Sequence, residues 1–146
     1  MKLFAHPKCW KFIEEHPEEF QSFGCGPGGI GDILVPDRIY GLDVSDACRI
    51  HDWYYRFHPS NSPDGRLEAD SIFKNNLLRI VKAKSKNKII RWLRVRRCRT
   101  YYSLVRFGGG PAYYEDRNPD SEYRVLDLDG LLAEVVVKGV KIDENV

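Results

Sequence analysis

Hydrophobic residues recur at helical spacing in three stretches of the chain. Residues 67–81 show the clearest pattern, because every third or fourth position falls on one helix face. That face comprises Asp70, Phe73, Leu77 and Ile80. A preceding helix is expected from the N-cap candidates at 43–46 to Tyr55, before a break at 59–65. A third helix, at about 84–106, should carry apolar residues between many basic ones.

Shorter elements are predicted nearer the two ends of the chain. Residues 6–20 fit one or two short helical turns, with the candidate core residues Trp10, Phe12, Ile13 and Phe20. Further on, Asp129-Gly130 lies between two apolar-rich segments, and Asp-Gly favours a tight hairpin turn. A small β-hairpin is therefore expected at about 123–141. The chain should be mainly α-helical, as a single domain over residues 1–146.

Charge is distributed unevenly, although the net charge is only +2. Nine Lys and Arg residues fall within 82–99, and no Asp or Glu occurs within 71–114. Such a basic segment is compatible with a solvated helix face, a nucleic-acid patch or a helix that lies on an anionic membrane. For the membrane interpretation, the candidate interface residues are Arg91, Trp92 and Arg94. Oligomeric state stays open.

The start of the sequence contains Lys2 but no apolar run of signal-peptide length, and no stretch approaches the ~18 apolar residues of a membrane span. We therefore expect synthesis in the cytoplasm, with any delivery by a viral particle or by non-standard export. Reduced thiols are then the default state, although three pairings are open to the four cysteines, Cys9, Cys25, Cys48 and Cys98.

Residues 23–32 form a predicted loop with metal-binding chemistry. Five glycines among the eight residues 24–31 allow positive φ angles and inward-facing carbonyl groups. Calcium prefers oxygen ligands, including backbone carbonyls, and Asp52 can add a carboxylate. Asp52 follows His51 on the predicted helix, about 100° around its axis, so both can face one cleft.

Asp70 lies on the apolar face of the next helix, where an unpaired carboxylate would be costly to bury. The imidazole of His51 is a suitable partner from an antiparallel neighbour. An imidazole that a carboxylate holds can present its other nitrogen to water as a general base. Tyr55 follows His51 by four residues and should lie on the same side of its helix.

Two other kinds of site fit parts of this pattern. The glycines match the dinucleotide-binding spacing Gly24-x-Gly26-x-x-Gly29, but no strand–helix–strand context precedes them and Pro27 is unfavourable there. Cys48-x-x-His51 together with Cys25 suggests zinc, but a fourth ligand at motif spacing is absent. Calcium is therefore the preferred metal.

Taken together, these residues resemble the phospholipase A2 superfamily. Residues 25–29, Cys-Gly-Pro-Gly-Gly, resemble its calcium loop, and residues 48–52, Cys-Arg-Ile-His-Asp, resemble its catalytic helix motif. Tyr55 and Asp70 match the family's conserved tyrosine and the aspartate that orients its histidine. The resemblance implies a core of one calcium loop and two antiparallel catalytic helices, at about 23–81, as in compact viral and microbial members.

The resemblance also implies calcium-dependent hydrolysis of a glycerophospholipid, at the sn-2 ester, on a membrane surface. His51 would be the base, held by Asp70 and Tyr55. The amide of Gly26 would stabilise the oxyanion. The implied calcium ligands are Asp52 and the carbonyl groups of Gly24, Gly26 and Gly28.

A disulfide between Cys25 and Cys48 is a further implication of the resemblance. Secreted animal members have cysteines where this chain has Ala47 and Tyr54, so most of their disulfide framework is missing. The alternative function is a non-catalytic protein of the same fold that binds membranes or nucleic acid through its basic helix.

Overall fold

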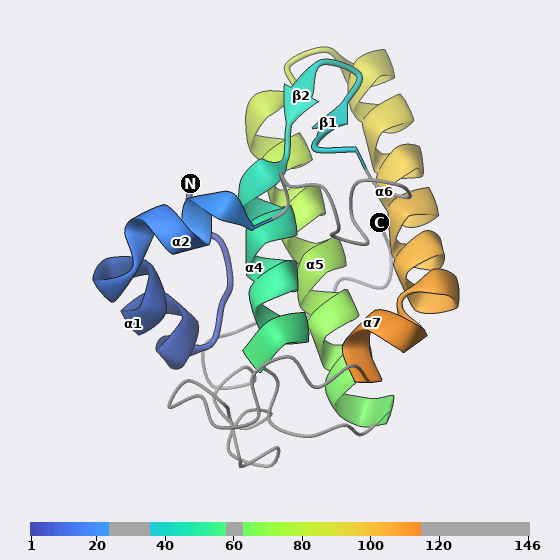
Figure 1. Ribbon diagram of the computed structural model, residues 1–146. Helices are drawn as coiled ribbons and strands as arrows, with labels where there is room; N and C mark the ends of the chain where they lie inside the picture. Colours follow the sequence, from blue (N-terminus) through green and yellow to red (C-terminus); the bar gives the residue numbers. More distant parts are fainter. Residues whose placement is uncertain (24–35, 58–62, 115–146) are drawn as a thin grey trace.

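The computed structural model describes residues 1–23, 36–57 and 63–114. This part of the chain is mainly helical, as predicted, with a small two-stranded antiparallel sheet (Figure 1). Its elements are α1 (Pro7–Glu15), α2 (Pro17–Ser22), β1 (Arg38–Ile39), β2 (Leu42–Asp43), α4 (Ser45–Phe57), α5 (Pro63–Lys84), α6 (Lys88–Gly108) and α7 (Gly110–Tyr114).

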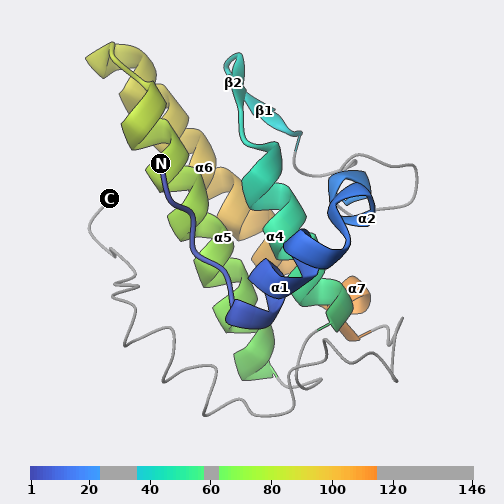
Figure 2. The same ribbon diagram turned by 90° about the vertical axis from the view of Figure 1, so that its left-hand side faces the viewer.

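The long helix α5 is the centre of the fold. It packs against α4 on one side and against α6 on the other, while α1 and α2 cross the far side of α4 (Figures 1 and 2). α5 begins at Pro63, so the predicted break at 59–65 extends too far. Proline is tolerated in the first turn of a helix because the amide that it lacks would have no partner there.

Side-chain caps explain where two of the helices begin. At the start of α4, the Asp43 carboxylate accepts a hydrogen bond from the Ser45 amide at 2.9 Å. At the start of α6, the Asn87 side chain accepts from the amides of Ile89 and Ile90, at 2.9 and 3.2 Å. Both contacts satisfy amide groups that have no partner within the helix.

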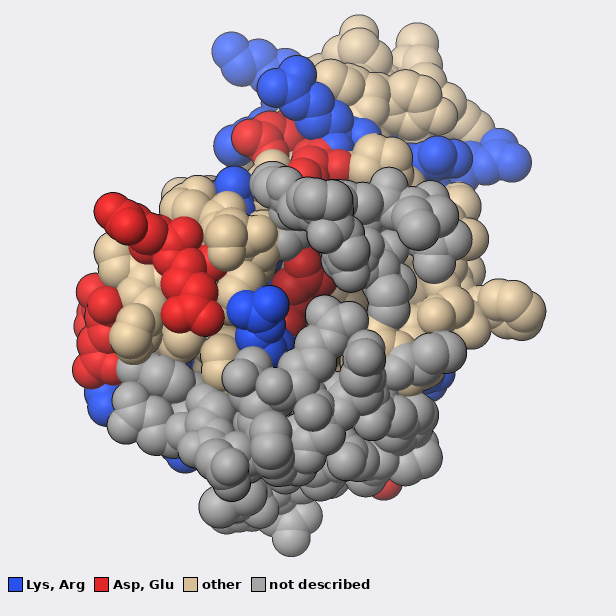
Figure 3. Space-filling view, in the orientation of Figure 1, with Lys and Arg blue, Asp and Glu red and all other residues tan. Residues whose placement is uncertain are grey.

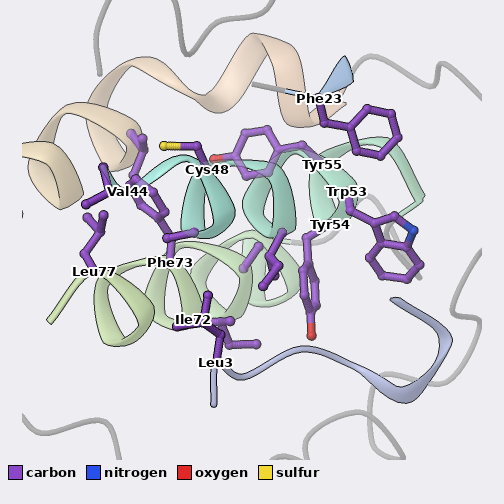
Figure 4. Close-up of a cluster of buried hydrophobic side chains, with 14 of the residues drawn as sticks. Leu3, Phe23, Val44, Cys48, Trp53, Tyr54, Tyr55, Ile72, Phe73 and Leu77 are labelled. Atoms are coloured by element: carbon purple, nitrogen blue, oxygen red, sulfur yellow. The ribbon is translucent and has the colours of Figure 1, made fainter. Parts of the chain in front are cut away.

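The hydrophobic core lies mainly between α4 and α5 (Figure 4). All four residues of the predicted α5 face, Asp70, Phe73, Leu77 and Ile80, are buried. Of the predicted core residues in α1 and α2, Phe12 and Phe20 are buried and Ile13 is partly buried. Trp10 is exposed, at 37%, so its assignment to the core is wrong. It lies on the outer side of α1, which is amphipathic.

The β-hairpin at 38–43 was not predicted from the sequence. Its turn residues Tyr40 and Gly41 both have positive φ, 45° and 76°. Such a turn matches the twist of paired strands and favours glycine. Arg94 of α6 donates to the Tyr40 carbonyl at 2.8 Å, so the hairpin is attached to the side of α6.

Two predicted elements lie outside the described residues, namely the glycine-rich loop at 23–32, apart from Phe23, and the hairpin at 123–141. Both stay predictions. Over the described ranges, none of the helices combines the length and the apolar character that a membrane crossing requires.

Candidate active site

His51 of α4 and Asp70 of α5 meet at the centre of the helix pair. The imidazole Nε2 lies 2.7 Å from Oδ1 of Asp70, and both side chains are buried. A carboxylate is only an acceptor, so the hydrogen bond requires the proton on Nε2. The lone pair of neutral His51 is then on Nδ1, which makes no hydrogen bond to another described residue. This nitrogen can accept a proton, as a general base must.

Tyr55 adds a second hydrogen bond to the same carboxylate oxygen. Its hydroxyl donates to Oδ1 of Asp70 at 2.7 Å, and its ring lies 4.2 Å from that of His51, centroid to centroid. In Figure 4 Tyr55 extends from α4 toward α6, whereas Tyr54 extends toward the N-terminal segment. Burial, followed by the negative charge of Asp70, raises the pKa of Tyr55, so it remains a donor over the whole physiological range.

Arg106 of α6 completes the set, and the sequence did not predict it. Its Nη1 lies 2.7 Å from Oδ2 of Asp70. Its own carbonyl accepts a hydrogen bond from Nη2 of Arg66 at 2.8 Å, which ties the end of α6 to α5. The sequence did indicate that some cation should be present, because a carboxylate buried beside a histidine requires a positively charged partner. The sequence could not identify which of many basic residues supplies it.

These contacts determine the ionisation of Asp70. Burial by itself would raise the pKa of this carboxyl group. The hydrogen bond from His51 and the positive charge that His51 carries when protonated, followed by the hydrogen bonds from Tyr55 and Arg106, outweigh burial and lower the pKa below its usual range. Asp70 is therefore a carboxylate at neutral pH and can hold the His51 imidazole in one orientation.

Gly109 allows Tyr55 to occupy its position. A Cβ atom at residue 109 would lie 2.6 Å from the Tyr55 hydroxyl and 2.5 Å from the Val105 carbonyl oxygen. Tyr113 of α7 then covers the Tyr55 ring edge-on, with 5.2 Å between centroids. Gly109 belongs to the glycine run at 108–110, where α6 ends and α7 begins. It also allows close packing beside the His51–Asp70 pair.

The predicted metal ligands fall in two groups. Asp52 is half-buried on α4 and directly follows His51, and its carboxylate is the kind of hard oxygen ligand that calcium prefers. Gly24, Gly26 and Gly28 lie outside the described residues, and so does Cys25. Over the described part of the chain, no group of three or more His, Cys, Asp or Glu residues is arranged to hold a metal. The calcium site, the oxyanion contact of Gly26 and the Cys25–Cys48 disulfide stay predictions.

The predicted interface residues differ in what they contact. Arg91 donates to the Ser85 carbonyl from Nε and Nη2, at 3.1 and 2.8 Å. Arg94 donates to the Ser85 hydroxyl at 2.9 Å and to the Tyr40 carbonyl. Both arginines thus hold α6 against the α5–α6 turn and the β-hairpin. Trp92 is the one of the three that is largely exposed.

Comparison with known proteins does not extend this description. No protein-family model matches the chain, and neither do the curated proteins or the solved structures that were compared with it. A functional conclusion must therefore be based on the geometry around His51 and on the motifs in the sequence.

Proposed function

We propose that this protein hydrolyses an acyl ester of a glycerophospholipid, with calcium as its cofactor and His51 as the general base. The observation that carries the proposal is the 2.7 Å contact between His51 Nε2 and the fully buried carboxylate of Asp70. Desolvating a carboxylate is costly, and Asp70 has three donors arranged around it. One of them is an imidazole whose other nitrogen is left to accept a proton.

The chemistry follows from the hydrogen bonds of His51. Nδ1 takes a proton from a water molecule as the water oxygen bonds to the ester carbonyl carbon. The imidazolium that forms is stabilised by Asp70, whose orientation Tyr55 and Arg106 fix. When the tetrahedral intermediate collapses, the proton passes from Nδ1 to the departing alkoxide oxygen. The products are a free fatty acid and an alcohol, and no covalent bond to the enzyme is needed.

Calcium would be held by Asp52 with the carbonyl groups of Gly24, Gly26 and Gly28, by resemblance to the phospholipase A2 superfamily. When bound, its chemistry is to polarise the ester carbonyl. The Gly26 amide would donate to the developing oxyanion. The same resemblance supports the sn-2 ester as the bond that is cleaved.

Release of fatty acid from phospholipid vesicles, with calcium or with excess chelator, tests the proposal. His51→Gln should lower the rate by about 10²- to 10⁴-fold, the usual contribution of a general base. His16→Gln is the matched control, because His16 is exposed on the surface between α1 and α2. Chelator should abolish the activity of the wild-type protein. Undiminished hydrolysis by H51Q, or in excess chelator, would sink the mechanism.

A non-catalytic membrane-binding protein is the second candidate, and the exposed basic helix α6 is the observation that favours it. It predicts vesicle binding without fatty-acid release. Such a protein has no need of a histidine that shares a buried carboxylate with a tyrosine and an arginine, so hydrolysis is preferred.

A further inference from the structure

Three large hydrophobic side chains along one side of α6 are exposed to solvent. Phe107 is 95% exposed, Ile89 is 72% exposed and Trp92 is 59% exposed. Phe107 lies eighteen positions after Ile89, which is about five turns of a helix with 3.6 residues per turn. The two side chains therefore leave α6 in nearly the same direction, about 27 Å apart along the axis at 1.5 Å per residue.

The opposite side of α6 faces the core. Its buried residues Cys98, Tyr101 and Val105 lie about 120–180° around the axis from Ile89, at 100° per residue. Trp92, by the same geometry, is within about 60° of Ile89 and Phe107. The three apolar side chains thus form a stripe that points away from the rest of the described protein. Isolated exposed hydrophobic residues are ordinary; these three differ in lying along one face of a helix that also carries basic side chains.

Basic side chains are placed between the apolar ones. Arg96 is exposed on the same stripe, and its guanidinium lies 5.8 Å from the centre of the Trp92 ring. Lys88 and Arg99 are exposed at its edge, and α6 has no acidic residue. Figure 3 shows Lys and Arg side chains gathered near the end of the molecule where α5 meets α6, with acidic side chains directly below them as well as over α1 and α2. The stripe therefore combines positive charge with exposed apolar surface.

We infer that this stripe, Ile89, Trp92, Arg96 and Phe107, docks α6 lengthwise on an anionic phospholipid surface. Apolar side chains at these positions can enter the boundary between head groups and acyl chains, while the arginines and Lys88 contact lipid phosphates. A nucleic acid could neutralise the same cations, but Ile89 and Phe107, at opposite ends of the stripe, would gain little from a phosphate backbone. A membrane can contact both the basic and the apolar side chains along the full length of the helix.

The choice of phospholipid rests in part on the proposed function, and the position of the stripe agrees with it. Phe107 directly follows Arg106, which binds Asp70. A docked α6 would therefore bring the end of the helix that supports the His51–Asp70 pair close to the lipid. Arg91 and Arg94, predicted as interface residues, are left out of the stripe because they contact Ser85 and Tyr40.

Tryptophan emission reports docking without any hydrolysis. H51Q protein with chelator is mixed with phosphatidylcholine vesicles that contain phosphatidylglycerol, and with pure phosphatidylcholine vesicles. The emission should shift to shorter wavelength with the anionic vesicles only. Trp92→Phe should abolish the shift and Trp10→Phe should keep it, because Trp10 is exposed on α1 and not on the stripe. An unchanged spectrum, or a shift that survives in W92F, would overturn the inference.

Vesicle co-sedimentation in the same H51Q background measures how much the basic and the apolar side chains of the stripe each contribute to binding. Arg96→Gln should weaken binding about fivefold, since one basic residue near an anionic membrane contributes about 1 kcal/mol. Lys11→Gln, which removes an exposed charge from α1, should have no effect. The double variant Ile89→Ser, Phe107→Ser should bind vesicles roughly tenfold or more weakly. Equal binding by R96Q and K11Q, or retention on RNA with no vesicle binding, would refute docking on lipid.

The docking surface and the proposed hydrolysis can fail separately. Vesicle binding by wild-type protein with calcium but without fatty-acid release supports the surface and contradicts the proposed function. Release of fatty acid from monomeric lipid, with no shift of Trp92 emission on vesicles, supports the proposed function and contradicts docking through the stripe.

Discussion

Arg106 supplies the positive charge that faces the second oxygen of Asp70, and Arg106→Gln removes that charge while keeping a polar side chain. Nη1 lies 2.7 Å from Oδ2, the Asp70 side chain is fully buried and that of Arg106 is 29% exposed. Breaking a fully buried ion pair costs about 3–5 kcal/mol, whereas an exposed pair contributes about 1 kcal/mol or less. The partial exposure of Arg106 gives an expected loss of unfolding free energy of roughly 2 kcal/mol.

Urea denaturation measures this loss directly, and the thermal midpoint should fall by roughly 4–8 °C for a chain of this size. Arg97→Gln is the matched control, because Arg97 is exposed on the same helix. Its guanidinium lies 5.3 Å from the centre of the Tyr101 ring, an exposed contact that contributes about 0.5–1 kcal/mol, so the unfolding free energy of R97Q should change by no more than about 1 kcal/mol. If R106Q and R97Q were equally stable, the guanidinium would not be needed to hold the buried carboxylate and the reasoning would be refuted.

The same substitution has a second consequence in the proposed reaction. Arg106 is one of the groups that lower the pKa of Asp70, so in R106Q the Asp70 carboxylate, which must be ionised to hold His51, takes up a proton at higher pH. The acid limb of the rate–pH profile should therefore move to higher pH in R106Q and stay in place in Arg106→Lys, which keeps the charge. A profile that does not move, in a protein that is less stable, would assign Arg106 a structural role only.

Two further substitutions test the surroundings of the site. Gly109→Ala should lower the unfolding free energy by about 1–3 kcal/mol, because its Cβ would overlap the Tyr55 hydroxyl and the Val105 carbonyl, as urea denaturation can measure. Gly110→Ala, which would meet only the end of the flexible Arg66 side chain, is the control and should cost less. Glu68 is buried without a hydrogen-bond partner among the described residues, and burial raises its pKa from 4.5 to about 7. Ionisation therefore costs the folded state stability as the pH rises from 4.5 to about 7. Glu68→Gln should raise the unfolding free energy by roughly 1–3 kcal/mol at about pH 8 and by almost nothing at about pH 4. A gain in unfolding free energy that did not depend on pH would contradict this explanation.

Local patterns in the sequence were sufficient to predict the helices that carry His51 and Asp70. Periodicity identified the buried face of α5, on which Asp70 lies beside Phe73. Spacing along α4 placed Tyr55 on the same side as His51, and the structure brings both to one carboxylate oxygen. These predictions succeed because each depends on residues within a few turns of one helix, together with the cost of burying a lone carboxylate.

The remaining contacts depend on how distant segments pack. Arg106 is 36 residues from Asp70, and nothing in its local sequence distinguishes it from the other arginines of α6. Gly109 is needed only because Tyr55 reaches across from α4. Arg91 and Arg94 donate to acceptors on the α5–α6 turn and on the β-hairpin, which their local sequence does not indicate. Sequence periodicity assigns a residue to a face, but the tertiary packing determines what that face contacts.

Helix α6 therefore has two separable tasks, which its consecutive residues Arg106 and Phe107 illustrate. Arg106 extends inward to Asp70, and Phe107 extends into the solvent on the stripe. Replacing the inward residue removes an ion pair that the folded state contains, whereas replacing the outward residue removes no buried contact of the described protein. R106Q should thus lose stability and keep vesicle binding, while F107S should keep stability and bind vesicles more weakly. A helix that served only as a structural support would give no such reciprocal pattern, because loss of binding would then follow loss of stability in both variants.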